Sequence, residues 1–226
     1  MSEGVSIAFI GAGIALLIAL FQEPVILFWR RIITKPALNI SFNLEPPFCH
    51  KTLFNNIVPV YYFRFQVFND GRTTAENCEA LIEELFYKKS EGSYIKEKNF
   101  FPINLTWSSR KIGEELLRHI NPHQRVYCDI GFITGSLEED NRLRKQQYKE
   151  WSVNSADDNK IIFLLALPLR PFSQKNYLAP GDYKINISIY SENAKRIKRI
   201  FIISWTGNWK DNEQEMFREI NIKEES

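Results

Sequence analysis

Cysteine and histidine are the residue types in this chain with the chemistry to bind a metal. Cys49 and His50 are adjacent, and the possible partners are Cys78, Cys128, His119 and His123. Structural zinc needs four convergent ligands, usually as closely spaced pairs. His119 and His123 are four residues apart, which is the spacing of one helix face, but Pro122 between them disfavours a helix. Cys78 and Cys128 fall at inward positions of predicted strands, where a free Cys behaves as a small hydrophobic residue. We predict neither a metal site nor a cofactor.

Acidic pairs are the second chemistry to consider. Glu83 and Glu84 are consecutive in a predicted strand, so we expect them to point to opposite faces and not to form a paired-carboxylate site. The sequence contains no G-x-S-x-G elbow, no H-E-x-x-H and no glycine-rich phosphate loop. We therefore predict no catalytic residues and expect that the protein is not an enzyme.

The densest basic run is KRIKR at residues 195–199. One interpretation is that these charges protect an edge strand from pairing with another chain. The other is attraction to an anionic membrane surface, assisted by Arg30, Arg31 and Lys35. With 29 Lys+Arg against 27 Asp+Glu, the formal net charge is only +2, and no nucleic-acid-binding motif is present. No nucleic-acid partner is predicted.

Tryptophans near the C-terminus have two interpretations. Trp205 and Trp209 flank Gly207, and such a pair either plugs the end of a core or, if exposed, serves as a binding anchor. Glycine between them allows close approach of the backbone. We favour the plug, and we expect Trp107 to lie in the core as well.

An apolar segment at the N-terminus defines the first region of the chain. Residues 5–21 carry no charge, and a second apolar stretch ends at Trp29. As a helix, residues 5–29 would span about 37 Å, which exceeds the roughly 30 Å hydrocarbon core of a bilayer. We predict that residues 1–31 form a single transmembrane anchor with a basic flank. The predicted membrane-flank residues are Trp29, Arg30, Arg31 and Lys35.

The charges around this segment predict its orientation. The short N-terminal flank carries Glu3 and no base, whereas Arg30, Arg31 and Lys35 follow the apolar run. The positive-inside rule then places the rest of the chain in the cytoplasm of a single-pass membrane protein. A cleavable signal peptide is the competing interpretation, but its basic leading region is missing.

Small residues recur in the apolar segment at four-residue spacing. Gly11, Ala15 and Ala19 would stack on one helix face and allow a second helix to approach closely. Such residues are also common in membrane helices generally. Two interpretations therefore remain, ordinary composition and self-association of the anchor.

The remainder of the chain shows the period-two alternation of β-strands. Apolar and polar residues alternate in LNISFNL and KINISIY, and no strong helical period intervenes. We expect strands within residues 38–44, 58–68, 78–87, 126–133, 161–167, 183–190 and 197–205. These predict an all-β fold, an antiparallel β-sandwich over residues 36–209 with short connecting helices. Residues 210–226 are expected to be a charged tail containing a short helix.

A strand–turn–strand pattern resembles a known group of domains. Val67, Asn69, Gly71, Ala75 and Asn77 match the pattern V.N.G...A.N of CARDB-like and other immunoglobulin-like prokaryotic modules. We also expect the turn to require a positive φ and a side chain that caps backbone donors. The later PG.Y pattern, which ends at Gly207 and Trp209, is similar to an uncharacterised family of prokaryotic single-pass membrane proteins. The resemblance implies an immunoglobulin-like sandwich and a topology, but no activity.

These observations together favour a binding function. We hypothesise a membrane-anchored, non-enzymatic interaction or accessory module that presents a cytoplasmic β-sandwich to a partner. The expected partners are membrane lipid and either another protein or further copies of the chain, and contacts would come from residues 89–99 and 135–159. The alternative is a membrane effector that oligomerises through its anchor into a pore.

Overall fold

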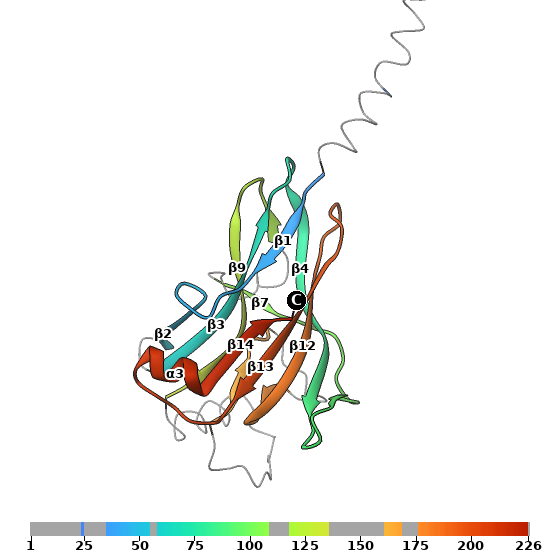
Figure 1. Cartoon of the computed structure of the whole chain (residues 1–226). Coiled ribbons are helices and arrows are strands. Elements are labelled where there is room, and N and C mark those ends of the chain that lie inside the picture. The colour runs from blue at the N-terminus through green and yellow to red at the C-terminus, as the bar shows by residue number, and fades with distance from the viewer. Residues whose placement is uncertain are drawn as a thin grey trace, which may run out of the picture.

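Alternating apolar and polar residues build two antiparallel β-sheets that pack face to face (Figure 1). The computed structural model describes residue 24 and residues 35–54, 58–108, 118–135, 161–168 and 176–225. The architecture within these ranges confirms the all-β prediction. No helix in this part of the chain has both the length and the apolar character to cross a membrane.

The first sheet has the strand order β1-β3-β9-β10-β11, with β2 on β3 and β7 on β9. Its strands are β1 (Leu38–Ser41), β2 (Cys49–Phe54), β3 (Val58–Asn69), β7 (Thr106–Trp107), β9 (Arg125–Thr134), β10 (Phe163–Leu165) and β11 (Tyr177–Leu178). The long strands β3 and β9 form its centre, and every pairing is antiparallel.

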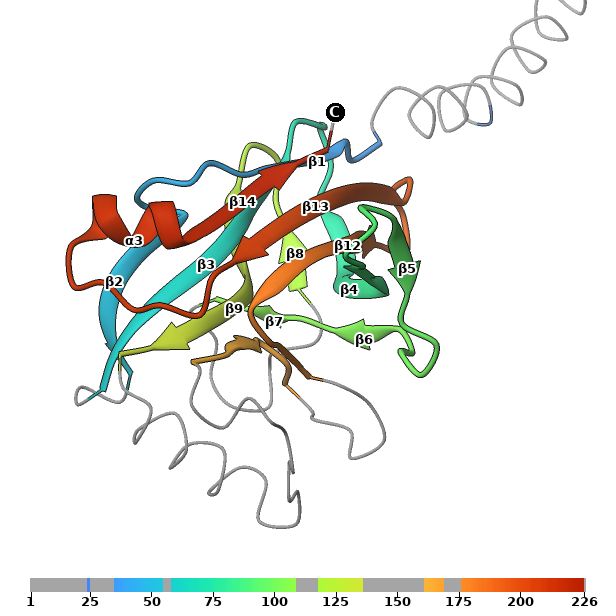
Figure 2. The ribbon, with the colours of Figure 1, turned by 60° about the horizontal axis from the view of Figure 1, so that its bottom comes forward.

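The second sheet has the order β14-β13-β12-β4-β5, with β6 and β8 also paired to β4. Its strands are β4 (Ala75–Lys88), β5 (Tyr94–Lys96), β6 (Ile103–Asn104), β8 (Arg118–Ile120), β12 (Gly181–Tyr190), β13 (Ile197–Trp205) and β14 (Ile220–Glu224). Figure 2 shows this sheet running from β14 across to β5.

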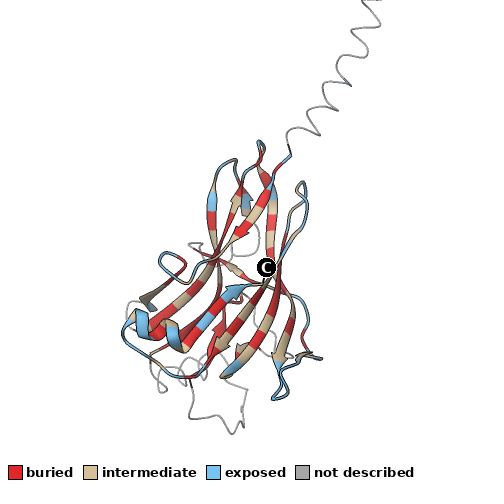
Figure 3. Ribbon diagram, in the orientation of Figure 1, coloured by how far each residue is buried: buried red, intermediate tan, exposed pale blue. Residues whose placement is uncertain are grey.

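The inner faces of the two sheets form one hydrophobic core. Alternate residues of β3 are fully buried, and they face the inward residues of β12 and β13. The β3 residues include Phe63 and Phe65, and the opposing residues include Ile185 and Phe201. Figure 3 shows this alternation of buried and accessible positions along the strands. Each such side chain contributes about 1.5–3 kcal/mol on burial, so period-two patterning fixes which face of each strand is inside.

The C-terminal residues depart from the expected charged tail. The predicted short helix is present as α3 (Glu213–Glu219), and the Asn212 side chain caps it by accepting from the backbone N–H of Gln214 and Glu215. The chain then continues as β14, and all of β14 pairs with residues 201–205 of β13. Ile220 and Ile222 alternate with exposed residues and are buried, so the sheet extends past residue 209.

Candidate functional site

One end of the sandwich gathers four segments that are distant in the sequence. They are residues 35–37 before β1 and the three turns at residues 69–73, 121–124 and 191–196, which we call the Asn69 end (Figure 1, top). Of the predicted membrane-flank residues, Lys35 lies here and is exposed. The others, Trp29, Arg30 and Arg31, lie outside the described residues, as do Gly11, Ala15 and Ala19.

Asn69 ties these segments together. Its side chain is fully buried, and its Oδ1 accepts from the backbone N–H of Ala37 (3.0 Å) and of Gly71 (2.9 Å). Its Nδ2 donates to the carbonyl oxygens of Thr73 (2.8 Å) and Ile120 (2.9 Å). The predicted capping role of this side chain is confirmed. The side chain also reaches the chain before β1 and the strand β8, which the local pattern did not indicate.

Gly71 has a different role from the expected one. The positive φ values among the described residues occur at Asn77, His123 and three other glycines, so the prediction of a positive φ in this turn is wrong. Gly71 is instead covered by the incoming chain, because a Cβ there would lie 2.5 Å from the Lys35 carbonyl oxygen and 2.6 Å from the Pro36 Cα. A glycine is required because residues 35–37 pack directly on the turn.

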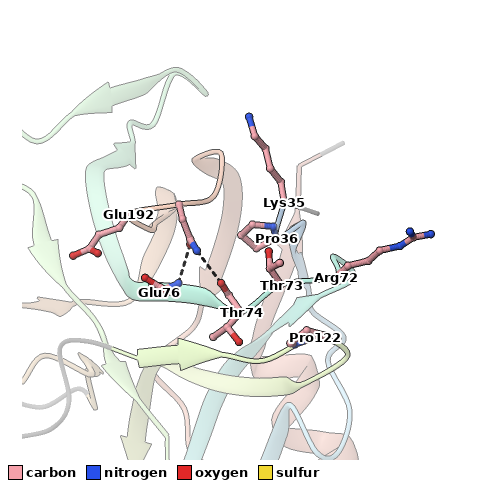
Figure 4. Close-up of a pocket in the computed structure, with 9 residues that line it drawn as sticks. Lys35, Pro36, Arg72, Thr73, Thr74, Glu76, Pro122 and Glu192 are labelled. Carbon is pink, nitrogen blue, oxygen red and sulfur yellow. Dashed lines mark hydrogen bonds between the residues drawn. The ribbon is translucent and has the colours of Figure 1, made fainter. Parts of the chain in front are cut away.

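A surface pocket of about 700 Å³ opens at the Asn69 end (Figure 4). Lys35 and Arg72 lie on one side and Glu76 and Glu192 on the other, and the side chains of Lys35, Arg72 and Glu192 point outward, away from one another. Asn193 connects its walls, because its Oδ1 accepts from the Glu76 N–H (2.9 Å) and its Nδ2 donates to the Thr74 carbonyl (2.9 Å). No local sequence pattern indicates this pocket, because its residues come from four separate segments.

The residues considered for metal binding do not converge in the described part of the chain. No group of three or more His, Cys, Asp or Glu residues there is arranged to hold a metal. Cys49, Cys78 and Cys128 are all buried and free, the last two at the expected inward positions. Burial raises the pKa of Cys49 to about 12 and that of Cys78 to about 11, so these thiols stay protonated and unreactive.

A polar cluster on the outer face of the first sheet was not anticipated. Asp129 accepts a hydrogen bond of 2.5 Å from the Ser108 hydroxyl, and its carboxylate lies 3.6 Å from the Arg64 Nε. Burial raises the pKa of Asp129, although Ser108 and the charges of Arg64 and His50 oppose that shift. The only sequence signal is an acidic residue within the apolar strand VYCDIGFI. A raised carboxyl pKa is common in binding sites, but structural ion pairs also produce it.

The prediction that Glu83 and Glu84 face opposite ways is wrong. On β12, Asn186 pairs with Glu84 and the next residue, Ile187, pairs with Ile82, so Glu83 is the extra residue of a β-bulge. The bulge interrupts the alternation, and both carboxylates reach polar groups on the outer face of the second sheet.

Each of these two carboxylates is neutralised by its own partners. Glu83 accepts from Tyr190 and pairs with Arg196, and Glu84 pairs with Lys96 (2.9 Å). Burial raises the pKa of Glu83, but hydrogen bonds from Tyr190 and Ser188 and the nearby bases outweigh it and lower the pKa overall. Hydrogen bonds from Lys96 and Asn186 lower that of Glu84. Two ionised, paired carboxylates are suited to stability and not to proton transfer.

Carboxylates of the second sheet pair with three of the four bases at residues 195–199. Arg196 pairs with Glu83, Lys198 lies 3.6 Å from Glu84, and Arg199 pairs with Glu224 on β14 (2.6 Å). Strand β14 pairs with β13 only at residues 201–205, so residues 197–199 pair with β12 alone and lie at an edge of the sheet, where the interpretation of these bases as edge protection places them. Their charge is largely compensated within the sheet.

The tryptophans lie as the plug interpretation predicts. Trp205 is 2 % exposed, and its indole N–H donates to the Ile161 carbonyl (3.3 Å). Trp209 is half-buried and packs on Tyr61, with ring centroids 4.9 Å apart. Trp107 is fully buried, as expected. Of the two predicted contact loops, residues 89–99 include the exposed β4–β5 hairpin, whereas residues 136–159 lie outside the described residues.

Comparisons with known proteins add no assignment. No protein-family model matches the chain, and no curated protein matches its sequence.

Proposed function

We propose that the chain is a membrane-anchored, non-enzymatic interaction module with an immunoglobulin-like sandwich on the cytoplasmic side. The observation that carries this proposal is the attachment of residues 35–37 to the Asn69 end. The Ala37 carbonyl accepts from the Asp70 N–H (2.9 Å), and the Ala37 N–H donates to Asn69. The chain is therefore fixed to the domain at Ala37, directly before β1.

The length of chain available supports a domain held close to the membrane. Lys35 lies four residues after Arg31, the end of the proposed anchor and flank. Four extended residues reach at most about 14 Å, so the Asn69 end would lie near the lipid headgroups. A module held at a fixed height and orientation suits a partner that is itself bound to the membrane.

The opposite end of the sandwich is then the surface that points away from the membrane. β4 runs from the Asn69 end to Lys88, and its fourteen residues span roughly 45 Å at about 3.3 Å each. The hairpin after it, residues 89–93, is exposed throughout. Loops placed by rigid strands are common contact surfaces, so this hairpin is the proposed contact region.

A crosslinking experiment tests the proposal. A photoreactive residue at Glu91, on the hairpin, should crosslink the full-length chain in native membranes to one reproducible protein. The same residue at Asn99 serves as an exposed comparison nearby. A flexible ten-residue spacer inserted before Lys35 should keep the chain in the membrane and reduce that crosslink severalfold. A chain that crosslinks to nothing from either position, or that releases dye from liposomes, would refute the module and favour a membrane effector.

A further inference from the structure

We propose that the free edge of β14 binds an extended segment of a partner protein as an added antiparallel strand. β14 lies at the outer end of the second sheet (Figure 2), and β13 pairs with it on one side only. An exposed sheet edge presents a row of backbone N–H and C=O groups with which a further strand can pair. This edge is a second contact surface of the module, separate from the far hairpin.

The alternation of backbone hydrogen bonds identifies the unpaired groups of β14. The Glu225 N–H donates to the Ile200 carbonyl oxygen (2.8 Å). In the register of these two strands, residues 221 and 223 therefore also direct their backbone groups toward β13. The N–H and C=O groups of Ile222 and Glu224 point away from β13, and no hydrogen bond between described residues uses them.

Edge strands of the first sheet are capped where β14 is not. On β1 the Ile40 N–H donates to the Asn39 side chain (3.0 Å), and on β2 the Lys51 N–H donates to the Glu213 carboxylate (2.8 Å). Such caps block the pairing of an edge with another chain. The two successive outward N–H groups of β14 have no such cap, so this edge remains open to a strand.

The side chains along the β14 edge indicate which sequence it accepts. Half-buried Phe42 packs on Phe201, with ring centroids 5.7 Å apart, and Phe201 pairs with Glu224. Apolar surface therefore lies beneath the edge and favours apolar residues at alternate positions of the added strand. On the outer face, Lys223 is exposed, and the ion pairs between described residues use other bases. An acidic residue opposite Lys223 would form a cross-strand ion pair.

A second copy of the chain does not fit this edge, an argument that rests on the proposed membrane anchor. β14 is antiparallel to β13, which begins at the Asn69 end, so β14 runs toward that end. Antiparallel pairing of two β14 strands around Ile222 would point the two Asn69 ends in opposite directions. Two anchors in one bilayer cannot adopt that arrangement. The occupant is therefore a strand from a different protein, with alternating apolar residues and an acidic residue opposite Lys223.

Fluorescence anisotropy of a dye-labelled peptide, SVEVTVS, with the full-length chain in detergent measures strand addition. Antiparallel pairing places the second valine of the peptide opposite Ile222 and its glutamate opposite Lys223. N-methylation of that valine removes the N–H that donates to the Ile222 carbonyl, and should weaken binding about five- to tenfold. N-methylation of the glutamate, whose N–H points away from β14, is the matched control and should change affinity about twofold or less.

Variants of the chain test the same contacts from the other side. Glu224→Pro removes an outward N–H without breaking a bond to β13, an edge position at which proline is tolerated. It should weaken peptide binding about fivefold relative to Glu224→Ala, which loses the same side chain but keeps the N–H. Lys223→Glu should weaken binding about two- to fivefold, and a peptide with lysine in place of its glutamate should restore it. Lys89→Glu, on the far hairpin, should change nothing.

Three results would overturn this inference. A chain that does not bind the peptide, or that binds the two N-methylated peptides equally, has no strand-addition site at β14. Self-association of the chain that Glu224→Pro abolishes would make a second copy the occupant. Peptide binding in detergent does not require an anchored chain, so its failure is distinct from failure of the proposed function, which release of the chain from membranes by carbonate would show.

Discussion

The amide of Asn69 joins three segments at one end of the sandwich, and two of its four hydrogen bonds, to Gly71 and Ile120, are buried from water. Asn69→Ala would leave two N–H groups and two carbonyls without this partner. Each unsatisfied buried group costs about 1–3 kcal/mol, and we expect the free energy of unfolding to fall by about 3 kcal/mol or more. Urea unfolding of the full-length chain followed by tryptophan fluorescence measures this change.

Asn99→Ala is the matched control for that substitution. Asn99 is exposed and lies in a turn, so its replacement should change the free energy of unfolding by less than about 0.5 kcal/mol. Equal effects of the two substitutions would show that the Asn69 side chain does not tie the end of the sandwich together.

Asp129 makes the free energy of unfolding depend on pH, and the direction of its pKa shift sets the sign of that dependence. Burial raises its pKa in the folded state, so the folded chain binds more protons than the unfolded chain between the two pKa values. Stability contributed by the protonated form is therefore lost as pH rises from about 4 through the raised pKa. We expect Asp129→Asn to remove this loss, so that the variant gains stability relative to the wild type as pH increases.

Urea unfolding at a series of pH values tests the Asp129 prediction. The measured quantity is the difference in unfolding free energy between the two proteins, which should increase with pH through the window above about pH 4. The same substitution at exposed Asp70 provides the comparison. A difference that is constant across this range would contradict a raised pKa at Asp129.

At the scale of single elements, the bulge in β4 makes a prediction about deletions. Glu83 is the residue without a partner on β12, and Ile82 and Leu85 on either side of the bulge both point into the core. Deleting Glu83 leaves a regular alternation of Ile82, Glu84 and Leu85. We expect this variant to fold, losing no more than about 2 kcal/mol from the contacts with Tyr190 and Arg196.

Deletion of Leu81 is the control for the bulge. Leu81 pairs regularly with Ser188, so its removal shifts one half of β4 by a residue and moves core side chains to the outer face. A cooperative urea transition should survive the deletion of Glu83 and be lost on deletion of Leu81. Loss of cooperativity in both proteins would contradict the assignment of Glu83 as the extra residue.

Strand β14 is predicted to be a structural part of the sandwich. Ile222 is 2 % exposed, whereas its neighbour Lys223 is exposed. Ile222→Ala should lower the free energy of unfolding by about 2–4 kcal/mol, because it removes buried methyl groups and leaves a cavity. Lys223→Ala should change it by less than about 0.5 kcal/mol. Thermal unfolding that is the same for both variants would indicate a dispensable tail.

At the scale of the whole molecule, orientation in the membrane can be tested with a single thiol. Cys49, Cys78 and Cys128 are buried, so they do not report orientation in the folded chain. Lys89→Cys places an exposed thiol on the far hairpin. The positive-inside rule predicts that an impermeant maleimide labels it only after the cells are permeabilised.

The wild-type chain and an Arg30→Glu/Arg31→Glu variant give the controls for orientation. The wild type, with only buried thiols, should remain unlabelled under both conditions. The variant lacks the charges that set the topology, so part of its Lys89→Cys thiol should become accessible in intact cells. Labelling of Lys89→Cys in intact cells without these changes would reverse the proposed orientation.

The sequence alone determined the regular parts of this fold. Alternation in KINISIY predicts β12, because a period of two places Ile185, Ile187 and Ile189 on one face wherever the strand lies in the sheet. The same local logic predicts the inward cysteines and a buried Trp107. The capping role of Asn69 also follows from its position in a turn, since its nearest partner, Gly71, is two residues away.

Features that depend on neighbours in space were decided only by the tertiary structure. The bulge at Glu83 is a mismatch between two strands, so neither sequence segment contains it alone. Gly71 is required because residues 35–37 cross over it, and β14 forms because the free edge of β13 is available to it. The pocket between Arg72 and Glu192 likewise exists only where the turns meet. Local periodicity reports which face of a strand is buried, but the partner of that face is set by packing between segments far apart in the chain.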